Sequence, residues 1–416
     1  MPRPPRRALS FAPALAPALW MLCGAGIVAG AYFTIPVIAP TLYEAGREGG
    51  ISVTAVSEAF QKSAVTHLPT PVPMRALYMT SCVVGTKALR DSLVKIAEET
   101  EINSIVIDVK DYSGTLSFKT GNPLFENIEL TRCGTLDMRE FVQTLHDRGI
   151  YVVGRITVFQ DPEYAKAHSL EAVQSISRQA PWKDYKGLSF IDVSSKPFWD
   201  YIVTLAKISY SDFGFDELNF DYIRYPSDGP MQDAVFVNPR KAETLETFFT
   251  YLHDELSPTG AVLSADLFGM TATNEDDLNI GQVLERALPY FDYIAPMVYP
   301  SHYPKQFNGW ANPNAYAYEV VHFSMARAVE RTIATTTSVL SFTGTPIAST
   351  TPQQYTKPVY DKLKLRPWLQ DFDYGGDYGP EEVRAQIQAT YDAGLTSWML
   401  WSPSNRYTIE ALHPEE

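Results

Sequence analysis

The sequence predicts an α/β fold: a (β/α)8 TIM barrel preceded by an N-terminal transmembrane segment. Three observations lead to this prediction. From about residue 73 onward, short β-rich runs alternate with helical stretches, which is typical of parallel strands joined by helical crossovers. The chain holds eight such units within a length that suits this barrel. Before them, the stretch from Ala8 to Tyr43 contains no charged residue.

The N-terminal segment begins with a short basic tail, residues 1–14, which contains Arg3, Arg6 and Arg7. Residues 15–38 are apolar and long enough to cross about 30 Å of hydrocarbon. Basic residues on one side favour keeping that end in the cytoplasm. We therefore expect a single-pass signal anchor in the cell membrane, with the rest of the chain extracytoplasmic. Secretion after cleavage of a signal peptide is the alternative.

The next segment, residues 39–72, is expected to be a linker. Glycine and proline recur in it without a sustained apolar period, which is typical of irregular connections. The globular domain is then expected to span residues 73–410.

Eight runs rich in valine, isoleucine and aromatic residues predict the barrel strands, because such side chains suit a pleated, buried surface. The run "YVVGRITVF" is a clear example. In chain order, the strands are expected at residues 75–81, 104–109, 151–159, 217–222, 262–268, 293–298, 366–371 and 397–401.

Helical stretches follow or separate these runs. Gly149 and Gly394 each come directly after one of them, where a glycine commonly ends a helix. The Thr/Ser/Pro-rich stretch 332–364 receives no element, and the seventh strand could lie there instead. The helices are expected at residues 87–99, 136–148, 196–210, 239–255, 283–288, 316–331 and 380–393.

An open, doubly wound sheet is the alternative fold. It would normally carry a glycine-rich turn after the first strand, and the sequence has none there. We therefore favour the barrel.

Composition limits the function classes. The formal net charge is −14, and nucleic-acid binding needs a basic face, so we expect no nucleic-acid partner. The sequence has neither a phosphate-binding loop nor a G-x-S-x-G motif. The few histidines form no metal-binding spacing, and we expect no metal ion or cofactor. Of the three cysteines, Cys82 and Cys133 lie in the globular part; one disulfide and two free thiols are equally compatible with the sequence.

Asp221 is the leading candidate for a catalytic carboxylate. It ends the fourth strand, in "DELNFDYIRYP", and active sites of these barrels lie where strands end. Strand side chains alternate, so Glu217, Asn219 and Asp221 share the face toward the barrel interior. The alternative is a structural ion pair with Arg155 or Arg224.

Asp266 occupies the corresponding position on the fifth strand, in "SADLFG". Adjacent strands lie about 4.8 Å apart. Two strand ends can therefore bring carboxylates to the separations of glycoside hydrolysis, about 5–5.5 Å for retention or about 6.5–9.5 Å for inversion. One would be the protonated acid and the other the nucleophile or base. A loop cap or a ligand hydrogen bond is the alternative role for Asp266.

Other polar and aromatic residues near strand ends are candidates for substrate binding. Structural alternatives remain for each, namely ion pairs, loop caps and, for the tryptophan, core packing. These candidates are Asp108, Arg155, Asn219, Arg224, Tyr299, His302, Asp371 and Trp401.

The segments "GFDELNFDYIRYPSDG", "SADLFGM", "FDYIAPMVYPSHY", "RPWLQDF" and "SWMLWSPSN" resemble a bacterial family of proposed glycoside hydrolases, first catalogued as a domain of unknown function. The resemblance covers roughly residues 73–406 and implies the glycosidase (β/α)8 barrel. In related barrels the strand-four aspartate is commonly catalytic, which implies that role for Asp221. Those relatives often carry glutamate at the position of Asp266.

The expected function is therefore hydrolysis of O-glycosidic bonds in an extracytoplasmic polysaccharide by two carboxylates. The alternative is a carbohydrate-binding or envelope barrel without turnover. A carboxylate separation far beyond about 10 Å would favour that alternative.

Overall fold

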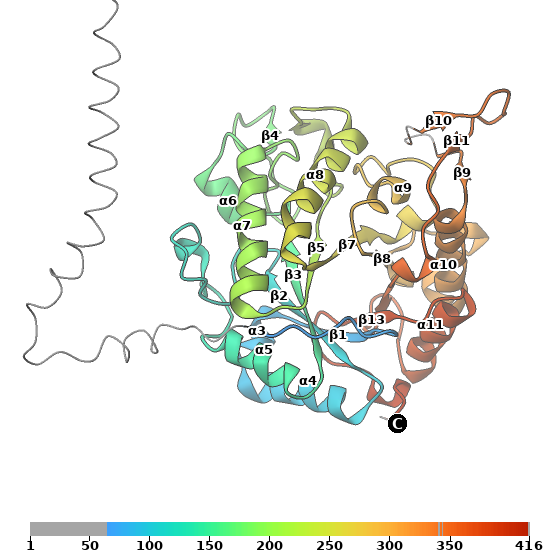
Figure 1. Ribbon diagram of the computed structural model, residues 1–416. Helices are drawn as coiled ribbons and strands as arrows, with labels where there is room; N and C mark the ends of the chain where they lie inside the picture. Colours follow the sequence, from blue (N-terminus) through green and yellow to red (C-terminus); the bar gives the residue numbers. More distant parts are fainter. Residues whose placement is uncertain (1–64, 340–341, 343, 415–416) are drawn as a thin grey trace, which may run out of the picture. The chain divides into compact units, whose positions relative to one another are not determined.

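Eight parallel strands close into a barrel in the computed structural model, which describes residues 65–339, 342 and 344–414 (Figure 1). Around the barrel the order is β1-β13-β12-β8-β7-β5-β3-β2. The barrel and all eight predicted strand positions are confirmed. The strands are β1 (Arg75–Met79), β2 (Ser104–Lys110), β3 (Tyr151–Thr157), β5 (Glu217–Asp221), β7 (Val262–Phe268), β8 (Tyr293–Met297), β12 (Trp368–Gln370) and β13 (Trp398–Trp401).

Helices cover the outside of the barrel (Figure 1). They agree with the predicted helices to within a few residues. The longer ones bury an apolar face against the strands, which gives the helical periodicity that the sequence shows. The helices are α4 (Lys87–Glu99), α5 (Met138–His146), α7 (Lys196–Phe213), α8 (Lys241–Leu256), α9 (Leu284–Ala287), α10 (Ala317–Ile333) and α11 (Pro380–Asp392).

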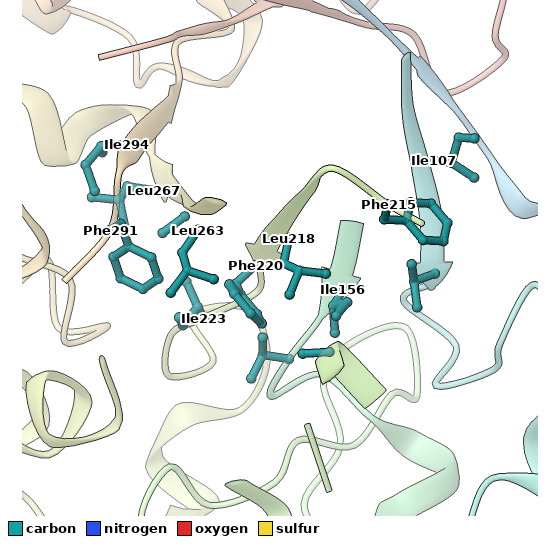
Figure 2. Packing of buried hydrophobic residues seen from close by; sticks show 14 of the residues in the cluster. Ile107, Ile156, Phe215, Leu218, Phe220, Ile223, Leu263, Leu267, Phe291 and Ile294 are labelled. Carbon is teal, nitrogen blue, oxygen red and sulfur yellow. The ribbon is translucent and has the colours of Figure 1, made fainter. Parts of the chain in front are cut away.

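The main hydrophobic core lies between the strands and these helices. Figure 2 shows part of it, with Leu218 and Phe220 of β5 beside Leu263 and Leu267 of β7. Side chains alternate along a strand, so the intervening positions of β5 face the barrel interior. Asp221 is one of these, as the sequence predicted.

Several short elements lie in the loops and were not predicted, because two to six residues carry too little periodicity. Two small antiparallel sheets are among them, one pairing β4 with β6 and the other in the order β10-β11-β9. The second sheet lies within the unassigned stretch 332–364, and the seventh barrel strand lies after it, as predicted. These elements are α3 (Ser81–Val84), α6 (Pro162–Ala167), β4 (Gln174–Ser175), β6 (Ala234–Val235), β9 (Thr336–Thr337), β10 (Thr345–Pro346) and β11 (Tyr355–Thr356).

Single turns of 3-10 helix complete the connections. They are η1 (Glu126–Ile128), η2 (Met231–Asp233), η3 (Ser257–Thr259), η4 (Gly269–Ala272), η5 (Pro300–His302), η6 (Phe307–Gly309), η7 (Pro313–Ala315), η8 (Lys362–Lys364) and η9 (Ile409–Ala411).

Residues 65–72 pack against the barrel at the amino ends of its strands. The backbone N–H of Leu68 donates to Asp216 over 2.7 Å, and the hydroxyls of Thr70 and Tyr151 are 3.0 Å apart. The basic tail and the predicted membrane segment, residues 1–38, lie outside the described residues, as does the linker up to residue 64. No helix in the described part of the chain has the length and apolarity to cross a membrane.

A disulfide joins Cys82 in α3 to Cys133 in the loop between β2 and α5, with a Cα–Cα distance of 4.6 Å. Of the two alternatives that the sequence left open, the structure shows the disulfide. Because α3 directly follows β1, the bond fastens two loops at the carboxyl ends of neighbouring strands.

Candidate active site

A cavity of about 320 Å³ opens at the carboxyl ends of the barrel strands, the end where (β/α)8 barrels carry their active sites. Most of the residues that the sequence singled out line it. These are Arg155, Asp221, Arg224, Asp266, Tyr299, His302 and Trp401.

The guanidinium group of Arg155 lies at the centre of the site. Its Nη1 donates to Asp108 over 2.6 Å, its Nη2 donates to Asp221, and its Nε lies 3.9 Å from Asp266. Arg155 therefore neutralises part of a cluster of three buried carboxylates. Burying several carboxylates together is costly unless a cation and hydrogen bonds compensate their charge. Arg155 provides that compensation, and we therefore expect the folded barrel to depend on its side chain.

Asp221 and Asp266 end up as neighbours because β5 and β7 pair in parallel, with Phe220 opposite Ala265. One residue further along, the register brings the two carboxylates level with each other. Both approach nitrogens of one guanidinium group. Their separation therefore stays within the roughly 9.5 Å over which paired carboxylates hydrolyse glycosides.

Asp266 is almost completely buried. Its Oδ1 accepts hydrogen bonds from the amide of Asn219 over 2.9 Å and from the indole of Trp368 over 2.7 Å. Burial, followed by the negative charge of Asp221, raises the pKa of Asp266 to about 8. The carboxyl group is therefore protonated at neutral pH. Because two donors occupy Oδ1, Oδ2 is the oxygen that carries the proton.

Asp221 has a different environment. Its Oδ2 accepts from Arg155, and its Oδ1 accepts from the backbone N–H of Tyr222 over 2.5 Å. The contact with Arg155 is a charge-assisted hydrogen bond, the stronger kind. Tyr222 itself has a φ of 49°, a conformation that is costly for a residue with a side chain and that often occurs at functional sites. This backbone turn places the N–H of Tyr222 against the carboxylate.

Asp108 is the third carboxylate of the cluster, but it does not line the cavity. Its Oδ2 accepts from the hydroxyl of Tyr78 over 2.5 Å, and its Oδ1 accepts from Arg155. Burial raises the pKa of Asp108 to about 6. The structure thus places Asp108 behind Arg155, where it holds the guanidinium rather than a ligand.

Aromatic rings form the wall opposite the carboxylates. The rings of Tyr78 and Trp401 stack with their centroids 3.9 Å apart and 16° between their planes. Arg155 lies 5.1 Å from the centroid of Trp401. Such a wall offers a flat, apolar face beside a charged group, which suits the face of a sugar ring.

Arg224, Tyr299 and His302 also line the cavity. Nη1 of Arg224 donates to the carbonyl of Tyr225 over 3.0 Å and to the hydroxyl of Ser227 over 3.1 Å. Burial lowers the pKa of His302 and raises that of Tyr299. Both side chains are therefore neutral at physiological pH, suited to hydrogen bonding and stacking.

Three of the predicted binding residues do not line the cavity: Asp108, described above, Asp371 and Asn219. Asp371 accepts from the backbone N–H of Thr408 over 3.0 Å and from its hydroxyl over 2.7 Å, so it anchors the C-terminal segment. Asn219 faces the barrel interior as predicted, but it contacts Asp266 and the hydroxyl of Ser264.

Sequence analysis did not propose four aromatic residues of the site. Tyr78, Tyr112, Tyr222 and Phe268 line the cavity. Each stands at or just after the carboxyl end of a barrel strand. Their position after a strand was the available signal. In the part of the chain that the structure describes, no group of three or more histidine, cysteine or acidic residues is arranged to hold a metal ion.

The fold and the cavity together define a class, that of (β/α)8-barrel proteins with paired carboxylates at the carboxyl ends of adjacent strands. Residues 76–407 match the family described as "Putative glycosyl hydrolase domain", and the chain belongs to that family. The predicted family resemblance is thereby confirmed. No curated protein matches the chain.

Solved structures share the fold. The glycoside hydrolase domain of PgaB (BpsB) from Bordetella bronchiseptica is similar with a TM-score of 0.54 and 13% identity, over 83% of this chain and 100% of that one. α-L-fucosidase isoenzyme 2 from Paenibacillus thiaminolyticus is similar with a TM-score of 0.51 and 11% identity, over 82% and 48%. A hypothetical protein from Ruminiclostridium thermocellum ATCC 27405 shares 31% identity over 46% of this chain and 96% of that one, with a TM-score of 0.41.

Proposed function

We propose that the protein is a glycoside hydrolase that cleaves O-glycosidic bonds of an extracytoplasmic polysaccharide, with Asp266 as general acid and Asp221 as its partner carboxylate. One observation carries the proposal. The two side chains face one cavity from adjacent strands, but Asp221 accepts a hydrogen bond from Arg155, whereas burial raises the pKa of Asp266. Such a division between two carboxyl groups is what acid-assisted glycoside cleavage requires.

The chemistry follows from this division. Asp266 transfers its proton to the glycosidic oxygen as the bond from that oxygen to the anomeric carbon breaks. Asp221 either attacks the anomeric carbon or takes a proton from the water that attacks it. Water supplies the hydroxyl group of the new reducing end. In the first case its remaining proton passes to Asp266; in the second it passes to Asp221, which releases it to solvent while Asp266 takes up a proton from solvent. The stacked rings of Tyr78 and Trp401 would hold the sugar against the carboxylates.

The site of action is part of the proposal. Residues 15–38 are apolar and follow basic residues, which favours a membrane anchor with the barrel outside the cytoplasm. The disulfide between Cys82 and Cys133 supports this placement, because such bonds persist mainly in oxidising compartments. Fractionation tests it: the full chain should sediment with membranes and be degraded by protease added to intact spheroplasts.

The activity is tested with the purified protein on soluble β-glucan, xylan, chitosan and pectin, with new reducing ends as the readout. Asp221→Asn and Asp266→Asn should each lose most of the activity that the unmodified protein shows. Asp392→Asn, an exposed carboxylate on α11 that bonds to Tyr318, is the matched control and should keep it. Undiminished hydrolysis by folded Asp221→Asn would sink the proposal.

A second function is favoured by one specific observation. The ion pair between Asp221 and Arg155 is also what a carbohydrate-binding barrel without turnover would contain. Binding without hydrolysis, measured by retardation in polysaccharide gels, would support that function. In that case Asp266→Asn would bind as well as the unmodified protein and no sample would release reducing ends.

A further inference from the structure

The mouth of the cavity carries two exposed tyrosines that the proposed chemistry does not use. Tyr112 lies in the loop after β2, and Tyr374 lies in the loop after β12. The exposed fraction is 47% for Tyr112 and 63% for Tyr374. Tyr112 lines the cavity itself. Tyr374 extends the lining, since its ring lies 5.5 Å from that of His302, with an angle of 30° between the planes.

The strand order places the two tyrosines on either side of the carboxylates. Along one arc of the barrel the order is β2, β3, β5, β7, β8 and β12. Asp221 ends β5 and Asp266 lies on β7, at the middle of this arc. The loop of Tyr112 is two strands from β5, and the loop of Tyr374 is two strands from β7. Tyr112 lines the cavity, and Tyr374 lies against His302, which also lines it, so a linear molecule that touches both rings spans the mouth of the cavity that the carboxylates line.

The loop that carries Tyr112 is fixed. The carbonyl of Tyr112 accepts from the side chain of Gln160 over 3.1 Å. The guanidinium of Arg132 lies 5.9 Å from the centroid of the Tyr112 ring. Arg132 directly precedes Cys133, which the disulfide holds against α3. A ring held in this way loses little freedom when a ligand stacks on it.

The loop that carries Tyr374 is fixed as well. The carbonyl of Tyr374 accepts from the amide of Asn314 over 2.9 Å, and the backbone N–H of Tyr378 donates to Asp373 over 2.8 Å. Gly376 packs closely against the amide of Asn314: a Cβ atom at this position would lie 2.6 Å from the amide nitrogen, so a larger residue would not fit without a shift. The loop is therefore held in place while the ring stays open to solvent.

We propose that the mouth binds an internal stretch of a polysaccharide chain, with one sugar unit on Tyr112 and another, beyond the cleaved bond, on Tyr374. This inference rests on the proposed hydrolase function and specifies its substrate: a linear polymer that is cut in its interior. An aromatic ring with an open face binds the apolar face of a pyranose without requiring a charge. The two platforms demand sugar units on both sides of the scissile bond.

The first test is the size of the early products. With a polysaccharide that the protein hydrolyses, a broad range of oligosaccharides should appear before single sugars do, and viscosity should fall early. Release of single sugars alone would overturn the inference but leave the hydrolase function intact. An absence of hydrolysis by the unmodified protein on every polymer of the panel would instead contradict the hydrolase function.

The second test compares substrates of different length. For Tyr112→Ala and Tyr374→Ala, kcat/KM on the polymer should fall more than kcat/KM on an aryl glycoside of one sugar, by roughly tenfold for each ring. Tyr318→Ala, in which a partly exposed tyrosine of α10 is removed, is the control and should change neither value. Equal losses on both substrates would contradict the two-platform arrangement.

A third measurement needs no turnover. Retardation of the protein in gels that contain the polymer reports binding alone. The double variant Tyr112→Ala/Tyr374→Ala should migrate faster than the unmodified protein. Equal retardation of the two would overturn the inference even if hydrolysis is never observed.

Discussion

The indole N–H of Trp368 on β12 donates to Asp266 on β7 over 2.7 Å, across the intervening strand β8. A donor aimed at a carboxylate stabilises its ionised form. This contact therefore opposes burial and the charge of Asp221, which together raise the pKa of Asp266 to about 8. Trp368 acts on the proposed acid in two ways, since it limits the rise in pKa and fixes which oxygen carries the proton.

The pH profile should have an alkaline limb set by Asp266. Because the proposed acid must be protonated, and its pKa in the free protein is about 8, kcat/KM should decline as the pH rises above 8. Initial rates between pH 5 and 10 measure this, with activity recovered after return to pH 7 as the control for unfolding. A rate that stays constant to pH 10 would contradict the role of Asp266.

Replacing Trp368 by phenylalanine should move that limb to higher pH. The substitution removes the N–H but keeps an aromatic ring, so the pKa of Asp266 rises further and the acid stays protonated for longer. Trp398→Phe is the matched control, because its buried indole donates to Tyr391 and not to a carboxylate. If the alkaline limb of Trp368→Phe lies at the same pH as in the unmodified protein, or at a lower pH, the indole does not control the pKa of Asp266.

The leaving group should decide how much Asp266→Asn costs. With a sugar as leaving group, the loss of the proton donor should lower kcat/KM by about 10² to 10⁴-fold. With a dinitrophenyl glycoside, whose leaving group needs no proton, the loss should be much smaller. Asp221→Asn should lower both rates. If Asp266→Asn loses both equally, the roles of the two carboxylates must be exchanged or abandoned.

Asp266→Asn should also stabilise the folded protein at pH 8. The pKa of Asp266 is raised from an ordinary 3.8 to about 8 on folding, so between these values the folded state binds more protons than the unfolded chain. Stability therefore falls as the pH rises through this range. Asp266→Asn removes that cost, and its free energy of unfolding should exceed that of the unmodified protein by about 1–2 kcal/mol at pH 8. Urea titrations at pH 4 and pH 8 check this, since the gain should vanish at pH 4.

Arg155→Met should destabilise the barrel strongly. It leaves Asp108, Asp221 and Asp266 buried without their shared cation, a situation that typically costs about 3–5 kcal/mol. Arg224→Met is the control, since its guanidinium bonds to a carbonyl and a hydroxyl, and it should cost at most about 1 kcal/mol. Urea unfolding at pH 7 measures both. Similar stabilities for the two variants would mean that the carboxylates do not depend on Arg155.

The barrel was predictable because its strands are local features. Each is a run of β-branched and aromatic residues with a turn on either side, and alternation along β5 alone placed Asp221 inside. The shared contact of Arg155 was not predictable, since it depends on three strands meeting at one point. The structure places Asp371 outside the cavity lining, where it contacts Thr408. Thr408 lies far along the chain, and no local pattern connects the two residues.

The contacts of the aromatic residues could not be predicted from the sequence either. Trp368 and Trp401 both follow the expected strand pattern, yet one donates to Asp266 and the other stacks on Tyr78. The sequence gives no sign of which way an indole N–H points. Tyr112 and Tyr374 lie in loops, where the anchoring contacts come from distant segments.

The bond between Cys82 and Cys133 bears on how the protein should be prepared. In material made in a reducing cytosol, the loops after β1 and β2 would not be joined covalently, and the loop of Tyr112 would keep its contact with Gln160 but lose the one through Arg132 and Cys133. An activity screen on such material would therefore underestimate the activity on long substrates. Periplasmic export or oxidative refolding is therefore the appropriate source for the first assays.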